Sequence, residues 1–205
     1  MLPNETAAGI PNVPMKTVVV FLGMTASGKS TLGKVWAKAC RAAYHNTDRV
    51  RKELAGLEPT DRRPDQVAHG IYSASFTEKT YQAMLDYARE DFLQGYEMVV
   101  LDGSYSTRQA RDQVRSLAEE LGAQCVFVFC TCSDGEVQRR LDQRKRDPDA
   151  VSDGRWEIYL YQKVTFELPN VSEEEEFIFL DTEQRVGEMV VWLSAHPLFQ
   201  DCHRQ

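Results

Sequence analysis

The stretch Gly23-Met24-Thr25-Ala26-Ser27-Gly28-Lys29-Ser30-Thr31 decides the fold of this 205-residue chain. It matches the pattern G-x-x-x-x-G-K-[ST], a glycine-rich loop between a strand and a helix that binds phosphate groups (a P-loop). Gly23 and Gly28 let the backbone turn tightly, so that successive N–H groups and the helix N-terminus face phosphate oxygens. In such loops the lysine neutralises the β and γ phosphates, and the next hydroxyl binds Mg²⁺. We therefore predict that residues 23–31 bind ATP, with Lys29 as the phosphate cation and Ser30 as a metal ligand.

Apolar, β-branched runs flank this loop and recur along the chain. They occupy residues 17–22, 42–46, 98–101, 125–130 and 177–180, and the second run is the weakest. Longer segments with helical spacing separate them. This alternation is typical of a parallel sheet covered by helices, because strands that are buried on both faces are continuously hydrophobic. We predict an α/β fold with five parallel strands, three layers and helices on both faces of the sheet.

Local signals indicate where several helices begin. Ser133 has Glu136 three residues further on, the spacing of a capping box. Thr107 is expected to cap the helix that follows it, because a threonine hydroxyl can accept a hydrogen bond from a free N–H of the first turn. For the same reason we expect Thr182 to cap a last helix over residues 183–194.

Three further segments give expectations that the structure can test. Residues 73–94 form the longest helical stretch, and their apolar positions predict a core-facing stripe. Residues 56–70 contain two prolines and are the most loop-like internal segment, so we expect a cover over a substrate. The four acids Glu173 to Glu176 are expected to form a solvated turn.

The chain is expected to form one domain between two tails. At this length a single domain buries about 70% of the surface that the unfolded chain exposes. We expect a flexible tail over residues 1–14, the domain over residues 15–196 and a second tail over residues 197–205. The N-terminus lacks the parts of a signal peptide, and no apolar run approaches the roughly 20 residues that span a bilayer. A cytoplasmic location is therefore expected.

Composition limits the classes of partner. The net charge of −7 argues against a long nucleic-acid footprint, which needs many cations on one face. A small or single-ended substrate fits better. The five cysteines and four histidines show no metal-ligand spacing, so reduced, buried thiols are expected rather than a zinc site.

Asp102 ends the apolar run that forms the third predicted strand. This position places its carboxylate at the carboxyl edge of the sheet, where ligands bind in open α/β folds. There it is a candidate for holding Mg²⁺ directly or through water, the role of the Walker B aspartate. An acid at a strand end is common by itself, and the P-loop makes the metal role the better interpretation.

Asp48 and Arg51 stand three residues apart just after the second predicted strand. The spacing places both on one face of a first helical turn. A carboxylate there can take the proton from an attacking hydroxyl, while the arginine holds an anionic group of the substrate. A surface ion pair is the alternative interpretation.

Five basic residues cluster near the end of the helix that Ser133 begins: Arg139, Arg140, Arg144, Lys145 and Arg146. One interpretation is a solvated helix end, where cations suit the helix dipole. The other is a lid that closes over ATP, with one or two arginines stabilising the transferring phosphoryl group. We favour the lid, because phosphoryl transfer in a P-loop needs such charge.

With these residues in place, the chain resembles P-loop kinases of the AAA_33 type, which are similar to the kinase domain of polynucleotide 5′-kinases and related to zeta toxins and gluconate kinases. The resemblance rests on residues 23–31, 47–51, 99–104 and 136–144. It implies a P-loop NTPase fold with strand order 2-3-1-4-5. It also implies that Asp48 is the general base, that Arg51 binds on the acceptor side, and that Arg140 and Arg144, four residues apart, are the lid arginines.

The sequence thus predicts an ATP- and Mg²⁺-dependent kinase with a hydroxyl-bearing acceptor. A sugar, a sugar acid, an antibiotic, another metabolite and a nucleotide or polynucleotide 5′-hydroxyl all stay open as acceptors. The alternative from another class is a nucleotide-binding switch or regulatory ATPase that has no acceptor. Switches usually carry an N-K-x-D stretch that selects GTP, and this chain has none. No membrane partner is expected.

Overall fold

The computed structural model describes residues 16–61, 69–147, 151–170, 172–174 and 176–199. The tail expected over residues 1–14 lies outside them, as does the middle of the expected cover, residues 62–68. Among the described residues, no helix combines the length and apolar character that a bilayer crossing requires.

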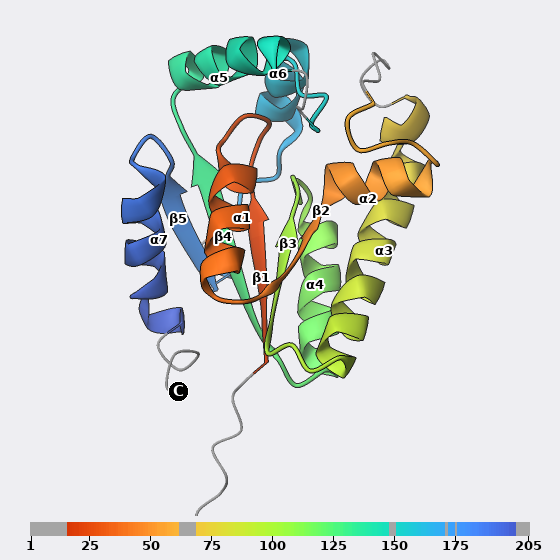
Figure 1. The fold of residues 1–205 in the computed structure, drawn as a ribbon, viewed down its shortest axis with the longest axis vertical. Helices are drawn as coiled ribbons and strands as arrows, with labels where there is room; N and C mark the ends of the chain where they lie inside the picture. Colours follow the sequence, from red (N-terminus) through yellow and green to blue (C-terminus); the bar gives the residue numbers. More distant parts are fainter. Residues whose placement is uncertain (1–15, 62–68, 148–150, 171, 175, 200–205) are drawn as a thin grey trace, which may run out of the picture.

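The core of the fold is a parallel sheet of five strands in the order β2-β3-β1-β4-β5 (Figure 1). The strands are β1 (Thr17–Leu22), β2 (Ala43–Asn46), β3 (Met98–Asp102), β4 (Gln124–Thr131) and β5 (Phe177–Asp181). β1 lies at the centre and pairs with β3 on one side and β4 on the other. The predicted fold class, the number of strands and their order are confirmed.

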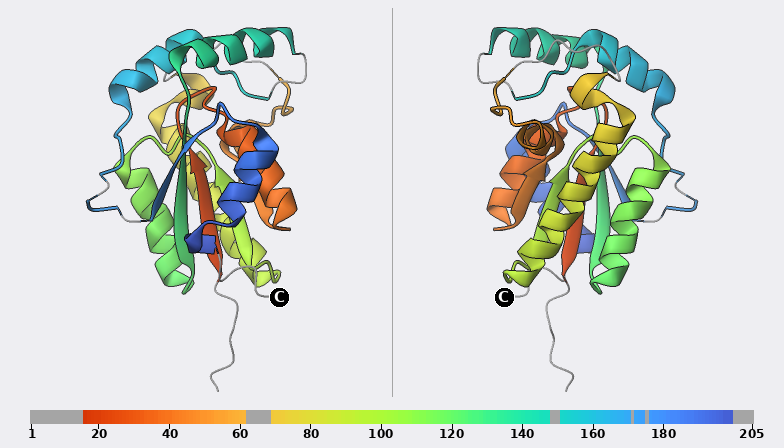
Figure 2. Two further views of the ribbon diagram at one scale, coloured as in Figure 1. Left: turned by 90° about the vertical axis from the view of Figure 1, so that its left-hand side faces the viewer. Right: turned by 90° about the vertical axis from the view of Figure 1, so that its right-hand side faces the viewer.

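Helices cover both faces of the sheet, and two more lie across its carboxyl edge (Figures 1 and 2). α1 (Lys29–Ala39) and α7 (Val186–Ser194) pack together on one face, and α3 (Ala74–Leu93) and α4 (Arg108–Glu120) on the other. α2 (Thr47–Leu54) packs on α3 beside the edge strand β2, and a short 3₁₀ helix, η1 (Gly70–Tyr72), precedes α3. α5 (Asp134–Arg146) and α6 (Trp156–Thr165) lie across the carboxyl ends of the strands.

The central strand β1 divides its side chains between two hydrophobic cores. Val18, Val20 and Leu22 belong to the core under α3 and α4, while Val19 and Phe21 belong to the core under α1 and α7. All five side chains are completely buried. Because both faces of β1 are covered, its continuous apolar sequence is what the fold requires.

Two of the three predicted helix caps form as expected. The hydroxyl of Ser133 accepts from the N–H of Glu136, and that of Thr107 accepts from the N–H of Ala110. The third prediction is wrong, because α7 begins only at Val186. Thr182 instead donates a 2.6 Å hydrogen bond to the carbonyl oxygen of Ser27 in the P-loop.

The acidic run is also not a simple solvated turn. Glu174 is 3% exposed and forms an ion pair with Arg111, which is completely buried on α4. Arg115 binds the same carboxylate, and burial acts to raise the pKa of Glu174 while these hydrogen bonds outweigh it and lower the pKa to about 2. The run therefore ties the segment before β5 to α4.

The folded body continues past residue 196, where the second tail was expected to begin. Phe199 is completely buried, and its ring lies 4.9 Å from the ring of Trp36 on α1. This contact fastens the end of the described chain to the core under α1 and α7.

Candidate active site

The P-loop joins the end of β1 to the start of α1 at the carboxyl edge of the sheet. Gly23 has φ +143°, and a Cβ there would lie 2.4 Å from the carbonyl oxygen of Cys130. Gly28 has φ +89°, and a Cβ there would lie 2.7 Å from Oγ1 of Thr182 and 2.8 Å from Nη1 of Arg140. Only glycine fits both the backbone angles and the space at these two positions.

Lys29 is partly buried and occupies the first position of α1. Its Nζ donates a 3.1 Å hydrogen bond to the carbonyl oxygen of Met24. Burial lowers the pKa of Lys29, while attraction from the carboxylates of Asp102 and Asp48 acts in the opposite direction. The ammonium group thus lies among acidic residues at the floor of the loop, where it can neutralise phosphate charge.

Asp102 ends β3 and is completely buried. Its Oδ2 accepts hydrogen bonds of 2.6 Å from the hydroxyl of Tyr44 and from the side-chain amide of Asn46, both on β2. Its other oxygen, Oδ1, has no hydrogen-bond partner among the described residues. Burial raises the pKa of Asp102, and Lys29 opposes this rise. The two β2 side chains therefore fix the carboxylate with one oxygen left to bind something else.

This arrangement fits a Mg²⁺ ion. Magnesium binds oxygen ligands and uses one or two carboxylates together with substrate phosphates and water. Oδ1 of Asp102 is a buried acceptor in need of a partner, and the Ser30 hydroxyl lies close enough to the same carboxylate to act against the rise in its pKa. A larger protein cage is not required, and the described residues contain no cluster of three metal-binding side chains.

Asp48 and Arg51 share one face of α2, as their spacing predicts. Nη1 of Arg51 lies 3.7 Å from Oδ1 of Asp48, and its Nη2 donates a long, 3.4 Å hydrogen bond to the hydroxyl of Thr77. The guanidinium group lies 4.8 Å from the ring centre of Tyr72, and its buried Nε has no partner among the described residues. The side chain of Arg51 is only 9% exposed, so its charge is buried and incompletely paired.

A cavity of about 650 Å³ lies beside these residues, and we call it the acceptor-side cavity after the roles that the sequence predicts for Asp48 and Arg51. Thr25 and Lys29 line it from the P-loop, and Asp48 and Arg51 line it from α2. Many of its other walls carry hydroxyl or amide groups, namely Ser75, Thr77, Ser104, Ser106, Gln109, Gln113 and Gln162. The cavity is therefore polar, and its walls include Asp48, the predicted general base, and Lys29, which is predicted to bind phosphate.

The loop also lines a second cavity, of about 520 Å³, and we call it the nucleotide-side cavity after the role that the sequence predicts for the lid arginines. Gly28 and Thr31 line it from the P-loop and α1, and Arg140 and Arg144 line it from α5. α5 is packed directly on the loop, because Val137 and Leu141 form a small hydrophobic cluster with Ala26. The predicted basic lid is thus in contact with the loop in this structure.

Arg140 uses its N–H groups to brace the P-loop. It donates to the carbonyl oxygens of Ala26 (3.1 Å) and Thr182 (2.7 Å) and to the Thr182 hydroxyl (2.9 Å). Glu136 accepts a further hydrogen bond from its Nε at 2.7 Å. These contacts hold Arg140 against the backbone of the loop.

Arg144 lies closer to the charges of the site. It is partly buried, and burial lowers its pKa, while Asp48 raises it and Arg140 lowers it further. It also acts on the pKa of Lys29, so the two cations lie near each other. The other basic residues differ: Arg139 and Lys145 form exposed ion pairs within α5 with Glu136 and Asp142.

Several site residues could not be found from the sequence. Tyr44 and Asn46 point at Asp102 because β2 and β3 pair in register, a contact across more than 50 residues. α6 was not predicted, because its apolar residues do not form one stripe: Tyr159 is buried while Val164 is 86% exposed. For Tyr44 and Asn46, the only signal in the sequence was their spacing of two residues, which places both side chains on the same face of β2.

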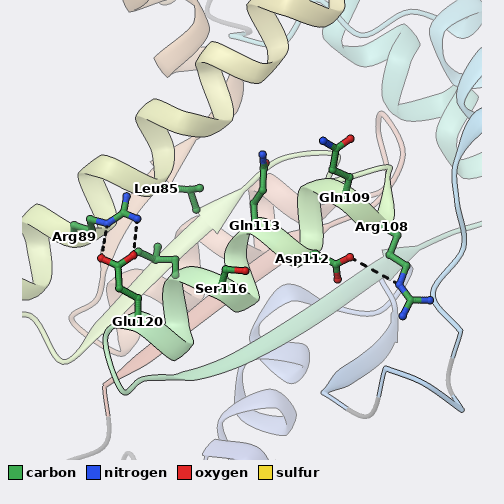
Figure 3. Close-up of a pocket in the computed structure, with 9 residues that line it drawn as sticks. Leu85, Arg89, Arg108, Gln109, Asp112, Gln113, Ser116 and Glu120 are labelled. Atoms are coloured by element: carbon green, nitrogen blue, oxygen red, sulfur yellow. Dashed lines mark hydrogen bonds and ion pairs between the residues drawn. The ribbon is translucent and has the colours of Figure 1, made fainter.

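A third hollow lies between α3 and α4, away from the P-loop (Figure 3). It has a volume of about 520 Å³, and the ion pair of Arg89 and Glu120 lies at one end of it. Gln109 and Gln113 line both this hollow and the acceptor-side cavity. None of the residues of the P-loop lines the hollow, so it is separate from the predicted ATP site.

Comparison with curated proteins finds distant relatives. A UPF0200 protein of Methanosarcina acetivorans is 26% identical over 140 residues, which are 67% of this chain and 71% of that protein. A tRNA dimethylallyltransferase of Dehalococcoides mccartyi is 25% identical over a match that spans 52% of its own length. These similarities are too low to transfer a function.

Solved structures share the fold. A sugar kinase from Janibacter sp. superposes with a TM-score of 0.63 at 17% identity and covers 88% of this chain and 93% of its own. A gluconokinase from Sinorhizobium meliloti superposes with a TM-score of 0.55 at 20% identity. The match covers 89% of this chain and 98% of the gluconokinase. An APS kinase of Mycobacterium tuberculosis, solved with AMPPNP and APS, superposes with a TM-score of 0.55 at 16% identity. The match covers 88% of this chain and 96% of the APS kinase.

The family is shown by the sequence itself. The model of the AAA_33 family, described as an AAA domain, matches residues 18–169, which include the P-loop, α2, Asp102 and α5. The match covers well over half of the chain, and the fold agrees with that of the kinases above. This protein therefore belongs to the AAA_33 family of P-loop proteins.

Proposed function

We propose that this protein is an ATP- and Mg²⁺-dependent kinase that transfers the γ-phosphoryl group to a hydroxyl of a small, polar acceptor. The observation that carries the proposal is the pair of cavities that meet at the P-loop. One is lined by Gly28 and the lid arginines, and the other by Lys29, Asp48 and Arg51. Each cavity is lined in part by the P-loop, so a donor and an acceptor can be held next to the same loop, as phosphoryl transfer requires.

Each charged residue has a distinct task in this proposal. The P-loop N–H groups and Lys29 bind the β and γ phosphates, and Arg144 donates hydrogen bonds to the group in transfer. Ser30 and Asp102 would hold Mg²⁺, which would supply positive charge to the phosphates of the nucleotide. Arg140 holds the loop in shape through Ala26 and Thr182.

The transfer step needs a base, and Asp48 is the carboxylate on the acceptor side. As the acceptor oxygen forms its bond to the γ-phosphorus, the bond from phosphorus to the bridging oxygen breaks and ADP leaves. The hydroxyl proton passes to Asp48. Arg51, 3.7 Å from Asp48, holds this carboxylate and presents its remaining N–H groups to the acceptor.

The cavity favours a small acceptor that carries an anionic group. Arg51 is buried with incomplete hydrogen bonding, which is costly unless a ligand supplies an anion. The hydroxyl and amide side chains of the walls suit a polyhydroxylated molecule, such as a sugar acid. The net charge of −7 disfavours a long polynucleotide, although a nucleotide or a short 5′-hydroxyl end belongs in the same test.

A screen of acceptors tests the proposal. Purified protein with ATP and Mg²⁺ is mixed with sugars, sugar acids, nucleosides, aminoglycosides and 5′-hydroxyl oligonucleotides, and ADP release is measured. We expect at least one acceptor to raise the rate, and Lys29→Ala to abolish the increase. Tight ATP binding with no response to any acceptor would favour the alternative, a switch or regulatory ATPase.

A further inference from the structure

α6 brings a side chain to the P-loop that neither the motif nor the lid includes. Oε1 of Gln162 accepts a 2.7 Å hydrogen bond from the backbone N–H of Thr25, across 137 residues of sequence. Both residues line the acceptor-side cavity, together with Lys29 and Asp48. Gln162 therefore lies on the acceptor side of the loop, at the wall where the proposed transfer takes place.

The hydrogen bond to Thr25 fixes which way the Gln162 amide points. A glutamine amide has an oxygen that only accepts and an NH₂ group that only donates. Because a backbone N–H can only donate, the oxygen must face Thr25 and the NH₂ group must face elsewhere. Nε2 has no hydrogen-bond partner in the part of the chain that the structure describes. A donor at this cavity wall is thus available to a ligand.

Contacts on both sides hold α6 in place and so position this donor. Tyr159 and Lys163, which flank Gln162, both bind the carboxylate of Asp134 at the start of α5, at 2.6 Å and 2.8 Å. The chain before α6 also touches the loop, because a Cβ on Gly154 would lie 2.2 Å from Oγ1 of Thr25. A side chain with such support does not lose further freedom when a ligand binds.

We propose that Gln162 is a catalytic residue that orients the attacking oxygen, an inference that rests on the proposed kinase function. An alcohol or water oxygen has two lone pairs and at least one proton. Nε2 of Gln162 donates to one lone pair, Asp48 accepts the proton, and the second lone pair attacks the γ-phosphorus. The new O–P bond replaces the bond to ADP, and the proton ends on Asp48, while Gln162 gains and loses nothing.

Two other roles for Gln162 predict different results. A residue that only braces the loop through Thr25 needs its oxygen but not its NH₂ group. If Gln162 only shields the γ-phosphate from water, then replacing it should make ATP hydrolysis faster. The orienting role needs the NH₂ group and accelerates attack by water as well as by an alcohol. ATP hydrolysis therefore separates the three roles without an identified acceptor.

The test compares ATP hydrolysis by the full chain at saturating MgATP in four proteins, with Lys29→Ala as the background that is subtracted. These are the wild type, Gln162→Met, Gln162→Glu and the control Gln138→Met, at an exposed position of α5. Glutamate keeps an oxygen for Thr25 but has no NH₂ group, whereas methionine has neither. We expect both Gln162 variants to lower the Lys29-dependent kcat about 100-fold, the lower range for removing one preorganised donor. The Kd of Gln162→Met for ATP should stay within about threefold of the wild type, about 0.7 kcal/mol.

Three results would overturn the inference. Wild-type turnover in Gln162→Glu with a loss in Gln162→Met would assign a bracing role. Faster hydrolysis in Gln162→Met would assign a shielding role. If the wild type shows no hydrolysis above Lys29→Ala, the orienting role of Gln162 fails, whereas the proposed function fails only if the acceptor screen also gives no response, so the two failures are distinguishable.

Discussion

Tyr44 and Asp102 lie on neighbouring strands, and the tyrosine hydroxyl donates a 2.6 Å hydrogen bond to Oδ2 of the aspartate. Asn46 donates a second bond to the same oxygen, so Oδ1 alone stays available for a metal or a water. The strand pair β2 and β3 thereby sets the direction of the carboxylate that we assign to Mg²⁺.

This contact gives a prediction for the metal requirement. Because partners that orient a metal ligand are typically worth about 10- to 100-fold in affinity or activity, Tyr44→Phe should raise the Mg²⁺ concentration for half-maximal activity about 10-fold. The kcat at saturating Mg²⁺ should change less. Tyr87→Phe, which removes a hydroxyl that binds Glu53 away from the site, is the matched control. An unchanged Mg²⁺ titration in Tyr44→Phe would speak against Asp102 as a metal ligand.

Asp48→Asn tests the proton acceptor. The amide keeps the size of the side chain but is a much weaker base, so the turnover should fall about 100-fold or more, within the usual range for general-base catalysis. The affinity for ATP, measured by calorimetry, should survive, because Asp48 lies in the acceptor-side cavity. Asp86→Asn, on the exposed face of α3, is the control. Full turnover in Asp48→Asn would remove this residue from the role of base.

The two lid arginines should give different defects. Arg144→Ala should lower kcat about 100-fold, because this arginine lies near Lys29 and is assigned to the group in transfer. Arg140→Ala should mainly weaken ATP binding and lower the Tm, because it removes the contacts to Ala26 and Thr182. Arg139→Ala, in an exposed pair, should resemble the wild type. Identical defects in the two lid variants would contradict this division.

Glu174 should make the free energy of unfolding depend on pH in the acidic range. Its pKa is lowered to about 2 in the folded protein, since the hydrogen bonds from Arg111 and Arg115 outweigh the effect of burial. Its ordinary pKa is higher, near 4.5. A group with a lowered folded pKa stabilises the protein above its ordinary pKa and loses this effect as the pH falls toward the folded value. The contribution should therefore be complete at pH 7 and disappear between about pH 5 and pH 2.

Urea unfolding of Glu174→Gln at pH 7 and pH 3 measures this effect. At pH 7 the free energy of unfolding should fall by about 3 kcal/mol, the lower end for breaking a buried ion pair. The difference from the wild type should shrink at pH 3. Glu173→Gln, whose partner Arg108 is exposed, should change little at either pH. A difference that is constant with pH would show that the ionisation of Glu174 is not the cause.

The parts of the fold that sequence predicted well are those fixed by local patterns. The P-loop glycines, the apolar strands and the caps at Ser133 and Thr107 all depend on residues within a few positions of one another. The strand order came with the family resemblance, because pairing between distant strands leaves no local signal. Asp48, Arg51 and Asp102 could be singled out because each lies at the end of a strand or just after one.

The failures share a physical cause, which is contact between distant segments. Thr182 was predicted to cap a helix, but its hydroxyl donates a hydrogen bond to the carbonyl oxygen of Ser27, 155 residues away. Glu174 was predicted to be solvated, but it is buried and forms ion pairs with Arg111 and Arg115. Gln162 lies on a helix without a clear apolar stripe, and only the folded chain places it at Thr25. Side-chain partners of this kind are set by packing rather than by spacing.

The most direct test of the account follows the phosphoryl group itself. Protein is incubated with [γ-³²P]ATP, Mg²⁺ and each acceptor of the panel, and the products are separated to show where the label goes. The account predicts label on a hydroxyl of at least one small polar acceptor, none with Lys29→Ala and about 100-fold slower transfer with Asp48→Asn. Label found only in inorganic phosphate, whatever acceptor is present, would contradict the assignment as a kinase.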